Sequence, residues 1–102
     1  NDIYSKILLK QASLDINNLE SVSALELTGD LLVVGTSRGR VFVIDVKIKK
    51  LLYQYNHKDA TSIVTSVMMT DDLRWIISSD VYGEMYFYVV KLKDDEDIKG
   101  GK

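Results

Sequence analysis

Residues 22–46 read VSALELTGDLLVVGTSRGRVFVIDV, and residues 64–90 read VTSVMMTDDLRWIISSDVYGEMYFYVV. Both stretches run through the same order of segments: an apolar run, a polar turn, an apolar run, a turn that contains glycine, and a third apolar run. Gly39 and Gly83 occupy the same place in the two copies and lie 44 residues apart. The chain therefore contains a repeated unit made of short predicted strands joined by tight turns.

The apolar runs inside each unit predict strands that are covered on both faces. A strand with one face in water alternates apolar and polar residues, whereas a strand buried on both faces is apolar throughout. The unbroken runs are Leu31–Val34, Val41–Ile44, Trp75–Ile77 and Met85–Val90. Trp75 is accordingly expected to be an anchor of the core.

The length of the repeat indicates the architecture. A unit of about 40–45 residues with several short strands is typical of one blade of a β-propeller, in which neighbouring blades cover each other's sheets. We therefore predict an all-β fold made of antiparallel four-stranded blades that form part of a propeller. A single β-sandwich or barrel is the alternative, since 102 residues is an ordinary size for one.

The predicted boundaries divide the chain into four parts. Residues 1–20 form a preceding strand or linker, residues 21–55 the first blade-like repeat, residues 56–90 the second, and residues 91–102 a charged tail. A closed propeller needs about 4–8 blades, and two blades alone would leave apolar sheet faces in water. We therefore expect the chain to be part of a larger propeller, and to self-associate or need a partner when isolated.

Residues 21–90 resemble the repeats of WD40-type β-propellers. The motif Gly-x-Val-x-Val-x-Asp is present at residues 39–45, and residues 28–37 and 70–79 match the turn and strand that precede it in that family. The run at residues 33–43 looks like the propellers of large scaffolding and vesicle-tethering proteins. The resemblance implies a rigid platform whose surface loops hold other proteins.

Both copies look like degenerate members of that family. The residues at the signature positions are Ile44-Asp45 and Tyr88-Val89 for the Trp-Asp pair, Asn56-His57 for the Gly-His pair, and Arg38 and Tyr82 for the turn aspartate. A network of His, Asp, Ser or Thr, and Trp side chains braces a standard WD40 blade. The resemblance implies that this network is incomplete in both copies.

The composition argues against catalysis and against a metal site. The chain has no cysteine and one histidine, His57, which excludes thiolate zinc sites and sites that need two histidines. Residues 35–39 read Gly-x-Ser-x-Gly, but a strand is expected to follow them, whereas a nucleophile elbow leads from a strand into a helix. Asp71-Asp72 is read as part of a turn, where aspartate commonly bonds the backbone. Residues 94–97 lack the spacing of a calcium loop and are read as a solvated tail. We therefore predict that the protein is not an enzyme and has no catalytic residues, cofactor or metal.

The candidate residues for contacts with partner proteins are Arg38, His57, Asp59 and Tyr82. In a propeller, the loop before the innermost strand and the loop between the second and third strands lie on the same rim. Those loops contain all four residues. Arginine and tyrosine are also enriched at the residues that dominate binding energy in protein interfaces.

These observations predict a non-catalytic scaffold that mediates protein–protein interactions within a multi-subunit assembly, such as one for vesicle tethering or trafficking. Its expected partners are other proteins, including the remaining blades of its own propeller or other subunits. The alternative is a propeller subunit that positions RNA for a partner enzyme. Arg38, Arg40 and the Lys47–Lys50 cluster suggest this alternative, and the net charge of −2 opposes it.

The sequence also bears on the compartment. No apolar run reaches the length of about 20 residues that a membrane-spanning helix needs. The absence of cysteine fits a reducing compartment, so we expect a cytoplasmic or nuclear location.

Overall fold

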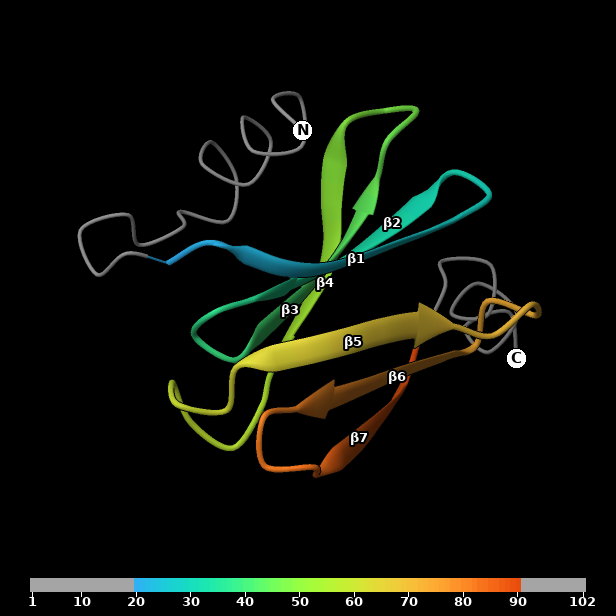
Figure 1. Cartoon of the computed structure of the whole chain (residues 1–102). Coiled ribbons are helices and arrows are strands. Elements are labelled where there is room, and N and C mark those ends of the chain that lie inside the picture. The colour runs from blue at the N-terminus through green and yellow to red at the C-terminus, as the bar shows by residue number, and fades with distance from the viewer. Residues whose placement is uncertain (1–19, 91–102) are drawn as a thin grey trace, which may run out of the picture.

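The computed structural model describes residues 20–90, which form seven strands in two antiparallel sheets (Figure 1). The strands are β1 (Val22–Thr28), β2 (Leu31–Thr36), β3 (Arg40–Asp45), β4 (Lys50–Asn56), β5 (Val64–Met69), β6 (Trp75–Asp80) and β7 (Met85–Val89). Their order is β1-β2-β3-β4 in the first sheet and β5-β6-β7 in the second, so each strand pairs with its neighbour in sequence. The predicted strand or linker at residues 1–19 and the predicted tail at residues 91–102 lie outside the described residues.

The two sheets share one buried core. β1 and β2 contact β5, which brings the first sheet against the second (Figure 1). The core residues are Leu31, Val33, Val41 and Val43 from the first sheet, and Val64, Val67, Met69, Ile76 and Val90 from the second repeat. A separate buried cluster lies on the opposite face of the first sheet and contains Leu32, Val34, Phe42 and Ile44. The prediction of an all-β fold with antiparallel blades is confirmed.

Burial differs between the two sheets. Every residue of β2 and the four inner residues of β3 are buried, which confirms the prediction that these strands are covered on both faces. The same prediction is wrong for β6 and β7, whose residues alternate between the covered side and the surface. Trp75, expected in the core, is 42% exposed. The reason is that, within residues 20–90, the second sheet is covered only where the first sheet packs against it.

The turn before the third strand of each repeat is closed in the same way. Thr36 Oγ1 in the first repeat and Asp80 Oδ1 in the second accept the backbone N–H groups two and four residues further on, at 2.9–3.2 Å. The turns then pass through Gly39 and Gly83, with φ angles of 73° and 82°. This left-handed conformation is strained for residues that carry a Cβ atom, which explains glycine at the same place in both copies.

Candidate functional site

His57 lies inside the second repeat, at the end of β4. Only 4% of its surface is exposed, and its ring stacks on the ring of Tyr86 with centroids 3.9 Å apart. Nδ1 lies 3.1 Å from the Ser62 carbonyl oxygen, and Nε2 lies 2.7 Å from Ser78 Oγ. The residue predicted to contact a partner therefore has almost no surface to offer one.

The donor and acceptor in each hydrogen bond around His57 can be assigned in only one consistent way. A carbonyl oxygen only accepts, so Nδ1 carries the proton and donates to Ser62. In the neutral ring Nε2 then accepts from the Ser78 hydroxyl, which in turn accepts from the Tyr55 hydroxyl at 2.8 Å. Burial lowers the pKa of His57 below its ordinary value of 6.5, although the Ser62 carbonyl and the Asp80 charge act in the opposite direction. The neutral tautomer is thus the form that this site holds.

Tyr55 is the far end of this chain of hydrogen bonds. Its ring stacks on Tyr88 with centroids 4.4 Å apart, so it joins β4 of the first sheet to β7 of the second. Burial raises the pKa of Tyr55 to about 12, while the hydrogen bond to Ser78 lowers it and nearby Tyr88 raises it further. Tyr55 therefore stays protonated and donates its hydroxyl hydrogen to Ser78.

Asp80 is the acidic residue of this site. Its Oδ1 accepts backbone N–H groups in the turn, and its Oδ2 accepts the Tyr86 hydroxyl at 3.1 Å. Burial would raise the pKa of Asp80, but the hydrogen bonds from the Glu84 backbone, the Tyr86 hydroxyl and the Tyr82 backbone lower it overall. Asp80 is therefore an ionised carboxylate that fixes the turn.

These contacts bear on two expectations about the bracing network. The position of the family's turn aspartate was assigned to Tyr82, so that aspartate was expected to be missing. The residue that holds the turn is an aspartate after all, Asp80, three positions before Gly83. The network was expected to be incomplete, and it does lack tryptophan. The histidine–serine pair is nevertheless intact, and the Tyr55 hydroxyl supplies the donor to Ser78.

The first repeat is braced by a buried ion pair that the sequence did not reveal. Glu20 is fully buried, and its Oε2 accepts Arg40 Nε and Thr36 Oγ1, each at 2.8 Å. Arg40 Nη2 also pairs with Glu20 Oε1. The Arg40 guanidinium carbon lies 5.1 Å from the centre of the Phe42 ring. Arg40, counted in the sequence as part of a basic cluster, is therefore engaged inside the fold.

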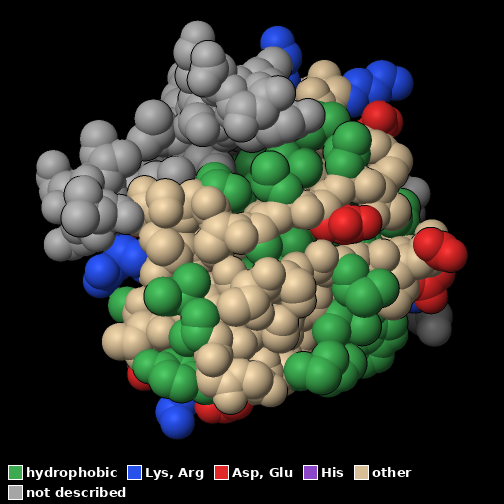
Figure 2. Space-filling view, viewed as in Figure 1, with side chains coloured by type: hydrophobic (Ala, Val, Ile, Leu, Met, Phe, Trp, Pro, Cys, Tyr) green, Lys and Arg blue, Asp and Glu red, His purple; other side chains and the backbone are tan. Residues whose placement is uncertain are grey.

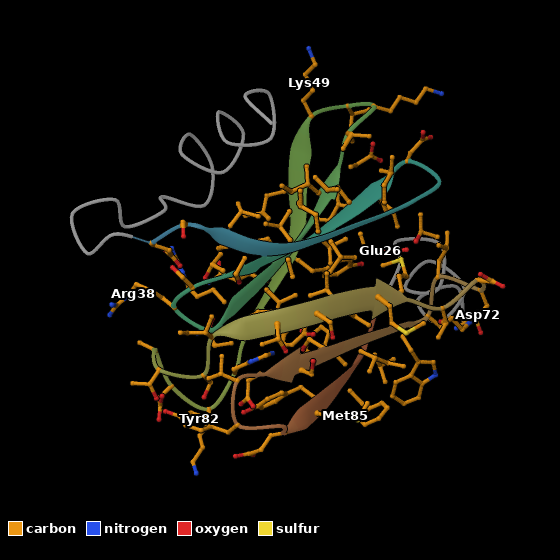
Figure 3. All side chains as sticks on the ribbon, viewed as in Figure 1. Glu26, Arg38, Lys49, Asp72, Tyr82 and Met85 are labelled. Carbon is orange, nitrogen blue, oxygen red and sulfur yellow. The ribbon has the colours of Figure 1, made fainter. Side chains whose placement is uncertain are left out.

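The other predicted contact residues lie at one end of the two sheets. Figure 3 shows Arg38 and Tyr82 at that end and Asp72 at the opposite end. Arg38 is half-buried, Asp59 is exposed, and Tyr82 is 64% exposed. The structure brings Asp59 and Tyr82 together, as shown next, and does not place Arg38 among the residues that line their pocket.

Thr61 links Asp59 to Tyr82. Its hydroxyl donates to Asp59 Oδ1 at 2.6 Å and accepts the Tyr82 hydroxyl at 3.1 Å. The side-chain and backbone hydrogen bonds from Thr61 lower the pKa of Asp59. These three residues, with Lys58, Ser62 and Glu84, line an open pocket of about 390 Å³. The buried Ser62 hydroxyl has no hydrogen-bond partner.

The second sheet carries an apolar surface on the side turned away from the first sheet, which we call the open face. Its exposed residues and their exposed fractions are Met68 (47%), Trp75 (42%), Met85 (60%), Phe87 (61%) and Val89 (49%). Cross-strand register places them on one side, because Trp75 lies opposite Val89. Hydrophobic side chains reach the surface over the second sheet in Figure 2, and Met85 is labelled there in Figure 3.

The described residues offer no metal site and no membrane-spanning helix. Between residues 20 and 90, no group of three or more histidine, aspartate or glutamate side chains is placed to hold an ion. In the same range no helix has the length and apolar character needed to cross a bilayer.

Comparison with known proteins bears on the fold. No protein-family profile matches the chain, and no curated protein is similar to it in sequence. The solved structures that are similar to the chain include the following two. One is the computationally designed Ika4 protein, with 22% identity and a TM-score of 0.57 over 70% of this chain and 42% of that one. The other is the β-propeller domain of Cps50 (Swd1) from Myceliophteria thermophila, with 23% identity and a TM-score of 0.59 over 72% of this chain and 24% of that one.

The chain therefore spans less than half the length of the structures that it matches. At this identity the likeness concerns the fold. The prediction of a partial propeller-like repeat protein is confirmed at that level.

Proposed function

We propose that this partial propeller is a non-catalytic scaffold for protein–protein interactions within a multi-subunit assembly, in the cytoplasm or nucleus. The observation that carries the proposal is the open face. An apolar surface of this kind on a soluble protein marks a place where another protein surface packs.

The internal repeat supports this interpretation, because the same positions are covered in the first sheet. Val41 and Val43 of β3 are fully buried, whereas Met85 and Phe87, at the equivalent positions of β7, are 60% and 61% exposed. The first pair is buried because the second sheet packs over it. A further sheet of similar apolar character, from another part of a propeller or from another subunit, would bury the open face in the same way.

The pocket formed around Thr61 offers a second, polar surface on the rim. Asp59 and Tyr82 lie on it, and Lys58 and Glu84 supply charges of both signs. A rim with charges of both signs suits contacts that decide which partner binds. The affinity of such a complex would come from the apolar surface that it buries. We assign Asp59, Tyr82 and the neighbouring Arg38 to partner contacts on this basis.

A pair of matched variants tests the open face. Met85→Lys/Phe87→Lys places two charges on it. Leu27→Lys/Ile48→Lys places two charges on apolar residues of similar exposure (54% and 57%) in the first repeat. We expect the unmodified protein to associate with itself or with a partner, and only the first variant to lose that association. Light scattering over a range of concentrations measures it. A stable monomer of the unmodified protein that captures no partner would contradict the proposal.

Salt dependence separates the vesicle-tethering scaffold from the RNA-positioning alternative. A complex built on apolar burial keeps its affinity as salt rises, whereas binding to phosphates weakens steeply. Because Arg40 is engaged with Glu20, the basic group that suggested RNA in the sequence loses one of its two arginines. This observation favours the protein scaffold.

A further inference from the structure

The outer edge of β7 differs from that of its counterpart in the first repeat. β3 is paired on both sides, by β2 and β4, whereas β7 is paired with β6 alone among residues 20–90. A strand at the edge of a sheet presents a row of backbone N–H and C=O groups that can pair with another strand.

The hydrogen bonds at the ends of β7 identify which of its groups face outward. The backbones of Glu84 and Val90 form hydrogen bonds of 3.1 and 2.7 Å on the β6 side. Antiparallel strands alternate the direction of their backbone groups from one residue to the next. The backbone groups of Met85, Phe87 and Val89 therefore point away from β6, to the outer edge. The side chains of the same three residues belong to the open face.

The first repeat shows what kind of strand occupies such an edge. At the positions equivalent to Met85 and Phe87, β3 lies opposite Tyr55 and Tyr53 of β4. β4 alternates half-buried and exposed residues, and its tyrosines pack against the shared core. An occupant of the β7 edge is thus expected to be extended and to carry large apolar side chains at alternate positions.

The sequence that follows β7 does not have this pattern. At the places that Tyr53 and Tyr55 hold in the first repeat, the second copy has Asp97 and Lys99. Charged side chains there cannot pack against Met85 and Phe87 without losing their hydration. The second copy therefore lacks, at these places, the aromatic side chains that β4 offers in the first repeat.

We infer that the edge of β7 takes up an extended segment of a partner protein as a fourth strand, antiparallel to β7, with aromatic or branched side chains opposite Met85 and Phe87. Main-chain pairing supplies the affinity in this mode of recognition, and the alternate side chains supply the specificity. The inference rests on the proposed scaffold function and specifies how a partner is held.

A synthetic peptide with the β4 sequence, Lys50–Asn56, is the probe for this edge. Hydrogen exchange followed by NMR reports on individual backbone amides of the protein. In the absence of peptide we expect the amides of Met85 and Phe87 to exchange rapidly, because they face the open edge. With excess peptide they should become protected, while those of Tyr86 and Tyr88, which face β6, change little.

Two N-methylated peptides separate backbone pairing from side-chain contact. Since the His57 N–H donates to the Gly39 carbonyl at 2.7 Å, the alternation of an antiparallel pair directs the amides of Tyr53 and Tyr55 toward β3 as well. Methylating those two amides should weaken peptide binding by about tenfold or more. Methylating the amides of Gln54 and Asn56, which face the other way, should leave binding unchanged.

Three results would overturn the inference. The first is no protection of Met85 and Phe87 at saturating peptide, and the second is equal binding of the two methylated peptides. The third is protection of these amides before any peptide is added. If that protection grows with protein concentration, a second copy holds the edge, and otherwise the chain's own residues hold it. A failure here leaves the scaffold proposal intact if the Met85→Lys/Phe87→Lys variant still abolishes association.

Discussion

Gly35 of β2 lies directly against the Val64 side chain at the start of β5. A Cβ atom at position 35 would be 2.2 Å from Val64 Cγ1 and 2.7 Å from Val64 Cβ. Val64 is fully buried, and its carbonyl oxygen accepts the Ser23 hydroxyl of β1 at 2.6 Å. The missing side chain at position 35 thus sets how closely the two sheets approach. Its counterpart in the second repeat, Ser79, has no further sheet over it among residues 20–90 and carries a side chain.

Gly35→Ala is expected to lower the free energy of unfolding by about 1–3 kcal/mol, because the added methyl group overpacks the junction between the sheets. The backbone of Val64 is held by β6 and Ser23, so it cannot move aside easily. Urea unfolding followed by tryptophan fluorescence measures the change. In a Val64→Ala background the same substitution should cost much less. Equal costs in the two backgrounds would show that the contact with Val64 is not the cause.

Ser78→Ala should destabilise the fold by about 2–4 kcal/mol, because it leaves two buried groups without a hydrogen-bond partner. The groups are His57 Nε2 and the Tyr55 hydroxyl, which lie 2.7 and 2.8 Å from Ser78 Oγ. Ser79→Ala is the matched control, since the Ser79 hydroxyl bonds to Ser66 at the surface, and it should change stability by about 0.5 kcal/mol or less. A similar loss in both variants would refute the role given to Ser78.

The sequence predicted those parts of the fold that depend on local pattern. It shows the turns at Gly39 and Gly83 and the unbroken apolar run of β2. These features are visible because backbone conformation and burial restrict which residue types stand at those positions. The exposure of Trp75 was not predictable in this way. An apolar strand looks the same in sequence whether or not its cover is present, and Trp75 lies on the side that the first sheet does not reach.

The contacts that hold the site together were harder to foresee. Glu20 stands before the first strand, where a carboxylate is usually solvated, and its partner Arg40 comes 20 residues later across β1 and β2. Asp80 had a signal that was missed. It occupies the place that Thr36 holds in the first repeat, and both cap the same turn, so alignment of the two copies on their turns would have identified it.

Arg40→Met should lower the free energy of unfolding by about 3–5 kcal/mol, because it leaves the carboxylate of Glu20 buried without its charged partner. The double variant Glu20→Gln/Arg40→Met removes both charges and should recover a large part of that loss. Thermal unfolding of the unmodified protein, Glu20→Gln, Arg40→Met and the double variant under one buffer condition provides the comparison. If the double variant is as unstable as the two single losses combined, the ion pair is not what couples these residues.

Acidification should destabilise the fold through His57. Burial lowers the pKa of His57 in the folded protein, whereas in the unfolded chain it keeps its ordinary value of 6.5. Above that pH the ring is neutral in both states and contributes no pH dependence. As the pH falls through 6.5 the unfolded chain takes up a proton that the folded protein does not, so the free energy of unfolding decreases until the folded ring is also protonated. Protonation would put a donor at Nε2 against the Ser78 hydroxyl, which must then turn its own hydrogen away. Urea unfolding at a series of pH values between about 8 and 5 measures this slope on the acid side of the ordinary histidine pKa. His57→Gln should be less stable at neutral pH and should show a flat profile over the same range. An unchanged slope in that variant would assign the pH dependence to other groups.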